Sequence, residues 1–493
     1  MSAVGVPAGG AAGGWETVIG LEVHVQLLTK SKMFCACATT FGDPPNTNVC
    51  PVCLGLPGAL PVPNAQAVRL AVRAAYALGL TVHPRSLFAR KNYFYPDLPK
   101  GYQISQHTEP LSTGGRLAIE SPDRGSVTMG ITRIHVEEDA AKSFHDKVPG
   151  MTAVDFNRSG LPLIEIVGEP DLRSPAEARA YLTALKQVLL YLEVSDCSME
   201  EGSLRVDANV SVRPAGSAEF RTRCEVKNLN AFSNVERALT FERDRHIAVY
   251  EGGGTIAQRT MTFDAATGAV RPTRSKEEAQ DYRYFPEPDL PPLVLTDAWL
   301  AVERAALPEL PAAKRARFEK TLGLSAYDAR VLSETRALAA YFEEVVVAGC
   351  GPKDAANWVM NDVLALSPDG EALPVSAAAT AAAIQLVKAG KVSRQNGRKV
   401  LAELLGGVFA DAASAAGAAE AAATKLGVLQ VSDTGEIDGW VREALDVHAG
   451  EVARYKGGEK KLYGFLVGQV MKQSRGRADP KLVNAAVQEA LKS

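Results

Sequence analysis

The chain has 493 residues, a length that predicts about three domains rather than a single compact core. Its 54 basic and 57 acidic residues give a formal net charge of −3, which excludes a uniformly basic surface for nucleic acid but not a local basic patch. Hydrophobic residues make up 46% and charged residues 23%, so a largely disordered chain is excluded.

The N-terminal residues 1–14 are rich in Ala and Gly, and we expect them to form a disordered leader. They have neither the charged start nor the apolar centre of a secretory signal. No apolar run reaches the roughly 18 residues of a membrane span, so we expect no membrane partner. The seven cysteines are therefore expected in a reducing, cytoplasmic compartment.

Strand-type segments bounded by Gly, Pro and Asn recur between residues 15 and 293. Asn64 and Ser174 are suited to begin two helices that interrupt them. We expect residues 15–293 to form a β-rich, cradle-like catalytic domain of the α+β class. The pattern predicts strands at 18–27, 127–136, 161–167, 204–212 and 223–229, and helices at 64–78 and 174–192.

The Pro-rich run 285–293 marks a boundary, after which Ala, Leu and Val recur with helical spacing. We expect an all-α helical domain at residues 294–407 and a small helical tail domain at 408–493. Two Ala-rich stretches predict helices within these domains, with a flexible linker as the alternative; they are residues 377–383 and 410–423. Asn396-Gly397 and Gly406-Gly407 predict turns.

Four of the seven cysteines form two short pairs separated by a loop of twelve residues: Cys35 and Cys37, then Cys50 and Cys53. Thiolates are soft ligands, and two such pairs can surround a tetrahedral Zn²⁺ ion. Four protein ligands would leave no open coordination position, so the predicted zinc site is structural rather than catalytic. Four ordinary free thiols are the alternative.

Candidate catalytic side chains first appear on the strand at 18–27, where alternation places Glu22 and His24 on one face. A carboxylate and an imidazole two residues apart can share a metal ion, although a solvated polar face has the same pattern. Glu165 lies within an apolar strand, where a charged side chain is costly unless it is paired or metal-bound. Exposure on an edge strand is the alternative for Glu165.

Three consecutive carboxylates follow the strand at 127–136, namely Glu137, Glu138 and Asp139. Strand alternation places Glu137 on the face of His135 if the extended geometry persists. Consecutive carboxylates repel one another unless a cation or basic groups lie among them, and a charged loop is the alternative.

Other polar segments add basic and aromatic groups. Residues 90–106 combine Lys91 with several tyrosines, which suits base stacking, the cover of a polar tunnel or a packed surface loop. Two further strands carry polar faces made of Arg205, Asp207 and Asn209, and of Glu225 and Lys227. Because the sequence has no P-loop, nucleophile elbow or Rossmann glycine pattern, a nucleotide site would depend on carboxylate-held Mg²⁺ and scattered basic groups.

The tail contains a basic patch that the total charge conceals. Residues 451–493 carry nine basic and four acidic side chains, a net of +5 that leaves −8 for the other 450 residues. Six side chains are candidate phosphate contacts with nucleic acid, with a solvated helical face as the alternative. They are Lys456, Lys460, Lys461, Lys472, Arg475 and Arg477.

Several long segments together resemble the B subunit of the bacterial glutamyl/aspartyl-tRNA(Gln/Asn) amidotransferase, from about residue 15 to the C-terminus. They are residues 15–26, 90–106, 130–139, 155–171, 227–230, 281–292 and 455–480. The resemblance implies a carbon–nitrogen ligase of protein biosynthesis, in which this chain forms a heterotrimer with a glutamine-hydrolysing amidase and a small third subunit. It implies that ATP phosphorylates the side-chain carboxyl of Glu-tRNA(Gln) or Asp-tRNA(Asn), and that ammonia released from glutamine by the amidase then attacks it. Nothing in the sequence decides between the two tRNAs.

The resemblance also implies roles for individual residues. Glu22, His24 and Glu138 match the family's magnesium-binding positions, and Glu165 matches a further active-site carboxylate. Lys91 matches a residue on the family's ammonia route, with Glu138 near its exit. Strand alternation favours Glu137 over Glu138, and a bend at the end of the strand would reconcile the two.

The resemblance implies that the cysteine cluster holds structural zinc outside the reaction, and that the tail binds tRNA. The alternative to an enzyme is a non-catalytic, zinc-containing adaptor protein that binds tRNA. An adaptor has no use for the set of Glu22, His24, Glu138 and Glu165, so that set discriminates between the two functions.

Overall fold

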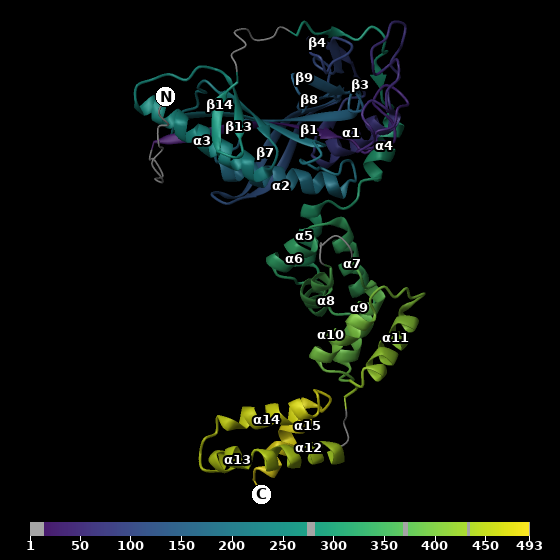
Figure 1. The fold of residues 1–493 in the computed structure, drawn as a ribbon, viewed down its shortest axis with the longest axis vertical. Coiled ribbons are helices and arrows are strands. Elements are labelled where there is room, and N and C mark those ends of the chain that lie inside the picture. Colours follow the sequence, from purple (N-terminus) through teal and green to yellow (C-terminus); the bar gives the residue numbers. More distant parts are fainter. Residues whose placement is uncertain (1–13, 274–281, 368–372, 431–433, 493) are drawn as a thin grey trace. The chain divides into compact units, whose positions relative to one another are not determined.

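The computed structural model describes residues 14–273, 282–367, 373–430 and 434–492, and the leader predicted at 1–14 lies outside these residues except for Gly14. The chain divides into two compact units between Leu310 and Pro311. Figure 1 shows the first, β-rich unit in purple to teal and the second, helical unit in green to yellow. This organisation confirms the predicted α+β fold class. The division follows Leu310, whereas the sequence predicted a boundary after residue 293.

A nine-stranded sheet forms the centre of the first unit, and all its neighbouring strands are antiparallel except β12 and β13. The five strands expected from the sequence are confirmed as β1, β7, β10, β11 and β12. In their order across the sheet the strands are β14 (Ala269–Pro272), β13 (Thr260–Asp264), β12 (Cys224–Leu229), β11 (Leu204–Pro214), β1 (Trp15–Gln26), β10 (Pro162–Gly168), β7 (Gly125–Glu138), β6 (Ser112–Ser121) and β2 (Thr81–Val82).

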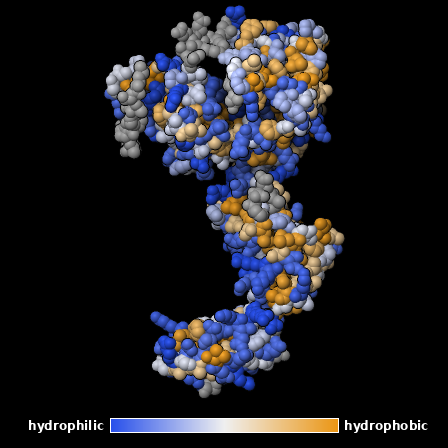
Figure 2. All heavy atoms as spheres, viewed as in Figure 1, coloured by the Kyte–Doolittle hydropathy of each residue, from blue (hydrophilic) through white to orange (hydrophobic). Residues whose placement is uncertain are grey.

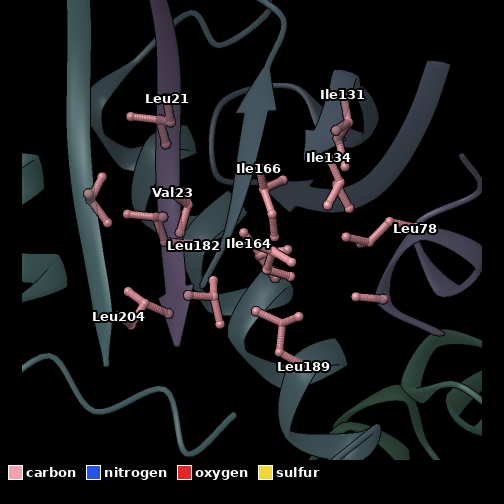
Figure 3. Close-up of a cluster of buried hydrophobic side chains, with 14 of the residues drawn as sticks. Leu21, Val23, Leu78, Ile131, Ile134, Ile164, Ile166, Leu182, Leu189 and Leu204 are labelled. Carbon is pink, nitrogen blue, oxygen red and sulfur yellow. The ribbon is translucent and has the colours of Figure 1, made fainter. Parts of the chain in front are cut away.

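Three helices pack against the apolar face of this sheet: α1 (Ala65–Ala77), α2 (Pro175–Tyr191) and α3 (Phe232–Glu251). The side chains of Asn64 and Ser174 cap α1 and α2, as the sequence predicted. Because β1 alternates, Leu21 and Val23 are buried in this core while their neighbours face the other way. Figure 3 shows these two side chains among others from β7, β10 and α2. The opposite face of the sheet is therefore free to carry polar groups.

Smaller elements complete the first unit. A three-stranded sheet has the order β15 (Phe285–Pro286), β4 (Ala89–Asn92) and β5 (Tyr102–Ser105). Two two-stranded sheets pair β16 (Leu293–Val294) with β3 (Arg85–Ser86), and β8 (Lys142–Val148) with β9 (Met151–Asp155). Helix α4 (Asp297–Ala305) packs on α1, where the Glu303 carboxylate forms ion pairs with Arg69 and Arg73. These ion pairs explain why the first unit extends past the Pro-rich run.

The described part of the second unit is helical, and its helices contain two separate hydrophobic clusters. The first cluster lies within α5 (Pro311–Lys320), α6 (Ala326–Leu332), α7 (Arg336–Val347), α8 (Pro352–Trp358), α9 (Ala377–Lys388), α10 (Arg394–Glu403) and α11 (Ala412–Lys425), and α8 continues into a π turn and a 3₁₀ turn, Val359–Val363 and Leu364–Leu366. The second lies within α12 (Thr434–Val447), α13 (Ala449–Lys456), α14 (Leu462–Gln473) and α15 (Pro480–Ala490). Among the described helices, none is long and apolar enough to cross a bilayer.

The Ala-rich stretches are confirmed as helices, since they form α9 and α11, which contact each other. The turn predicted at Asn396-Gly397 is wrong, because both residues lie inside α10. A side chain at Gly397 would meet Val387 Cγ2 at 2.5 Å and the Trp358 ring at 2.9 Å. Glycine is used here for close helix packing rather than for a turn.

Candidate active site and metal centres

Four titratable side chains meet on the polar face of the sheet, on three adjacent strands. The backbone register pairs His24 of β1 with Glu165 of β10, and Glu165 with His135 of β7. Glu165 Oε2 lies 3.4 Å from His24 Nε2 and 3.2 Å from His135 Nε2. Glu137 completes the group, with its Oε1 3.7 Å from His24 Nε2. We call these four side chains the first acidic group. Ligand atoms of His24, Glu137 and Glu165 all lie within 4.8 Å of one another, so the group could hold a metal ion.

The electrostatics of this group follow from its burial. Desolvation alone would raise the pKa of Glu165, but hydrogen bonds from His135 and His24 outweigh it and hold that pKa well below its usual range. Desolvation would lower the pKa of His135, but the two carboxylates raise it to about 9. The pKa of His24 is raised as well, by Glu165 and Glu137 against desolvation. The contacts between the imidazoles and the carboxylates thus favour the protonated form of each histidine and the ionised form of Glu165.

A second acidic group lies beside the first and consists of Glu22, Asp207 and Glu225 from β1, β11 and β12. Its ligand atoms also lie within 4.8 Å of one another. Lys227 Nζ lies 2.6 Å from Asp207 Oδ2 and 3.0 Å from Glu225 Oε1. Burial, followed by the charges of Glu165, Glu225 and Asp207, still raises the pKa of Glu22. The group therefore has more negative charge than Lys227 balances, and its oxygen donors fit Mg²⁺.

Both acidic groups line one cavity of ≈ 390 Å³. Lys91 of β4 also lines it, with its ammonium 4.9 Å from the Tyr282 ring centroid. Burial would lower the pKa of Lys91, but the nearby charges, first that of Glu137, raise it above its usual value. Tyr282 and Tyr284 line the cavity although the sequence did not single them out. In the sequence, only their place in the 281–292 segment pointed to them, because the pairing of β15 with β4 cannot be predicted from the residues of either strand alone.

The structure does not bring together the predicted magnesium set of Glu22, His24 and Glu138. Glu22 lies in the second acidic group, His24 lies in the first, and Glu138 lies in neither. Strand β7 continues through Glu138, which pairs with Pro162, so the bend that would have turned Glu138 towards His24 is not formed. Instead Glu138 accepts hydrogen bonds from the Lys100 ammonium and the Ile104 backbone N–H. Glu137 lies beside His24 and His135, on the face that strand alternation predicted for it.

The four sulfur atoms of Cys35, Cys37, Cys50 and Cys53 lie within 4.8 Å of one another. A hydrogen bond from Cys35, helped by the nearby Lys32 ammonium, lowers the pKa of Cys53 to about 4. Lys32 is fully buried, and its Nζ lies 3.6 Å from Cys53 Sγ. Four soft donors beside a buried cation fit a Zn²⁺–thiolate cluster, whose net charge would be negative. These cysteines do not line the cavity, which agrees with a structural role.

The basic residues of the tail lie at the ends of α13, α14 and α15. Lys460 lies 4.3 Å from the Tyr455 ring centroid, and Arg477 lies 5.5 Å from that of Trp440. Figure 2 shows mostly hydrophilic side chains on the visible face of these helices. Within the described residues, none of the six candidates forms an ion pair with a carboxylate. They are Lys456, Lys460, Lys461, Lys472, Arg475 and Arg477, of which the first five are exposed.

The β-rich unit with its carboxylate-lined cavity is similar to the GatB/GatE catalytic domain. The model of that domain matches residues 17–301, and the GatB domain model matches residues 340–491. Curated aspartyl/glutamyl-tRNA(Asn/Gln) amidotransferase B subunits are similar over nearly their whole length. That of Geotalea uraniireducens is 51% identical over 477 residues, covering 95% of this chain and 98% of the relative. Those of Geobacter sulfurreducens and Moorella thermoacetica are each 50% identical, over 97% of this chain and 99% and 100% of theirs. The chain belongs to the family of aspartyl/glutamyl-tRNA(Asn/Gln) amidotransferase B subunits.

Proposed function

We propose that the chain is the B subunit of a heteromeric, tRNA-dependent amidotransferase that converts Glu-tRNA(Gln), Asp-tRNA(Asn) or both into Gln-tRNA(Gln) and Asn-tRNA(Asn). The observation that carries the proposal is the cavity in which two acidic groups face Lys91 and Lys227. An adaptor that only binds tRNA would have no use for so much buried charge, which lowers stability unless a ligand compensates it.

The chemistry needs an activated carboxyl, because a carboxylate is a poor electrophile. A side-chain oxygen of the aminoacyl group takes the terminal phosphoryl group of ATP and ADP leaves. Ammonia then attacks the acyl carbon, and inorganic phosphate leaves as the amide forms. Mg²⁺, when bound, neutralises the phosphate charges during such a transfer. Its ligands would come from the second acidic group and from His24, Glu137 and Glu165.

The chain's own residues have distinct tasks in this proposal. Lys91, which the resemblance places on the route of ammonia, also presents a positive charge to the anionic phosphates, and Lys227 keeps Asp207 and Glu225 in position. His135 fixes the orientation of Glu165 through its 3.2 Å contact. Glu138, held by Lys100 outside both acidic groups, is assigned to the route of ammonia rather than to Mg²⁺.

The remaining assignments concern partners. We assign ammonia supply to a glutaminase partner, and the assembly to a small third subunit, in the cytoplasm where charged tRNA is used. The six basic candidates of the tail would contact tRNA phosphates, because five of them are exposed and none of the six forms an ion pair among the described residues. The cysteine cluster would hold one structural Zn²⁺.

The test compares Glu165→Gln with Glu120→Gln, an exposed control on β6 of the same sheet. Each variant is co-purified with its glutaminase and small partner chains and assayed for ATP hydrolysis that depends on Glu-tRNA(Gln) or Asp-tRNA(Asn). We expect Glu165→Gln to lose about 100-fold or more in turnover, the range seen when preorganised electrostatic stabilisation is removed. Glutaminase activity should persist. Wild-type ATP turnover in Glu165→Gln would leave the adaptor function as the better account.

A further inference from the structure

A fourth cluster of side chains that could bind a metal lies on the other side of the sheet from the cavity. Cys224 begins β12, and Glu242 and His246 lie one turn apart on α3. One ligand atom from each, a sulfur, an oxygen and a nitrogen, lies within 4.8 Å of the other two. The three residues are 1%, 0% and 0% exposed, so the cluster is sealed between the helix and the strand.

His246 is the anomaly in this cluster. Both of its ring nitrogens are buried, and neither has a hydrogen-bond partner among the described residues. Its Nε2 lies 3.4 Å from Glu242 Oε2 without the geometry of a hydrogen bond. Buried imidazoles ordinarily donate or accept at least once, because an unsatisfied buried polar group is costly. The His246 ring therefore lies beside a carboxylate and a thiol, but no hydrogen bond within the described residues compensates for its burial.

Arg245 sets the charge of the cluster. Its guanidinium donates to both Glu242 oxygens, at 2.8 and 2.7 Å, and to Cys224 Sγ at 3.5 Å. These contacts keep Glu242 ionised while leaving each oxygen a further lone pair. A divalent cation would be balanced by the Glu242 carboxylate and a Cys224 thiolate, with Arg245 remaining as an outer partner.

We propose that Cys224, Glu242 and His246 form a metal site for Zn²⁺ or a similar divalent transition metal. One thiolate, one imidazole and one carboxylate are a donor set of this class, whereas Mg²⁺ and Ca²⁺ prefer oxygen alone. Binding forms the metal–sulfur bond and releases the thiol proton of Cys224 to solvent. The site is separate from the four-cysteine cluster and does not depend on the proposed function.

The position of the site suggests what it does. The metal would join α3 to the first residue of β12, and the next residue, Glu225, belongs to the second acidic group. Neighbouring residues of a strand face opposite sides, so the bound metal would fix the backbone that presents Glu225 to the cavity. The site is thus a structural clamp behind the cavity.

The test counts bound metal in the full-length chain. Reduced protein is stripped with chelator, reloaded with Zn²⁺, freed of excess ion and analysed for zinc per chain. We expect His246→Gln and Cys224→Ser each to hold one equivalent less than wild type, and His246→Cys, which restores a ligand, to regain it. Cys197→Ser is the matched control, because Cys197 is also a fully buried thiol of the first unit and belongs to none of the clusters.

A second measurement keeps the test decisive if one variant folds poorly. Co²⁺ absorption should show a component with a single thiolate in wild type and Cys197→Ser, absent from Cys224→Ser and from His246→Gln. Mg²⁺ at the same concentration should not displace it. Equal zinc content in wild type, His246→Gln and Cys224→Ser, with no difference in the Co²⁺ spectra, would overturn the proposal.

Discussion

Alternate side chains of β1 point into the hydrophobic core and into the cavity, so we expect the first set to affect stability and the second to affect activity. Substitutions at two neighbouring residues test this. Leu21 is 1% exposed within the core, and Glu22 faces the cavity. Truncating a fully buried leucine to alanine costs about 3–4 kcal/mol through lost burial and the cavity left behind. For a unit of this size that corresponds to a drop of about 5–6 °C in the thermal midpoint. Leu21→Ala should therefore lose stability and keep its turnover at 20 °C.

Glu22→Gln should keep its stability and lose turnover. The pKa of Glu22 is raised by burial and by the charges of Glu165, Glu225 and Asp207, so its ionised form is disfavoured in the folded state. A raised pKa contributes stability that is fully present below the unfolded value near 4.5 and is lost as pH rises through the folded value. At pH 7.5 in chelator, Glu22→Gln should thus match or exceed the wild-type midpoint, and the difference should disappear below pH 4.5.

The assays are calorimetry of both variants and ATP hydrolysis that depends on Glu-tRNA(Gln). Glu22→Gln should lose most of that hydrolysis because it removes one of the carboxylates proposed to hold Mg²⁺. The reasoning is refuted if Leu21→Ala is inactive while folded, or if Glu22→Gln lowers the midpoint as much as Leu21→Ala does.

Three further predictions follow from the sites. Glu137→Gln should raise the Mg²⁺ concentration for half-maximal ATP hydrolysis at least tenfold, the usual effect of a lost ligand, while Glu138→Gln should leave it unchanged; equal shifts would contradict the assignment. Cys53→Ser should remove one zinc per chain and lower the thermal midpoint without changing the Mg²⁺ titration, because the cysteine cluster lies outside the cavity; a changed Mg²⁺ titration would count against a purely structural role. Lys472→Ala and Arg475→Ala should each reduce the salt slope of tRNA binding by about one, measured between 50 and 200 mM salt; an unchanged slope would remove these residues from the interface.

The alternation of single strands was enough to predict much of the site. Glu22 and His24 on one face of β1, and His135 with Glu137 on one face of β7, follow from the two-residue period of an extended chain. The resemblance favoured Glu138 for the metal and required a bend at the end of β7, whereas the strand stays extended through Glu138.

Other features depend on contacts between distant segments and could not be predicted locally. The second acidic group exists because β1 pairs with β11 and β11 with β12, which joins residues almost two hundred positions apart. Tyr282 reaches the cavity through the pairing of β15 with β4. Asn396-Gly397 carries the local signal of a turn, but Ser393 caps a helix there and close packing requires the glycine.

The alanine helices of the second unit give its core a different tolerance to mutation. In α9 and α11 most of the buried positions are Ala, including Ala379, Ala383, Ala415 and Ala419. A methyl group leaves little to truncate, but any larger side chain must push two closely packed helices apart. The core beneath β1 is built from Leu, Ile and Val and is weakened by smaller residues instead. Under random mutation, substitutions that remove side-chain volume should therefore be lost from the core beneath β1, and substitutions that add volume should be lost from the contact between α9 and α11.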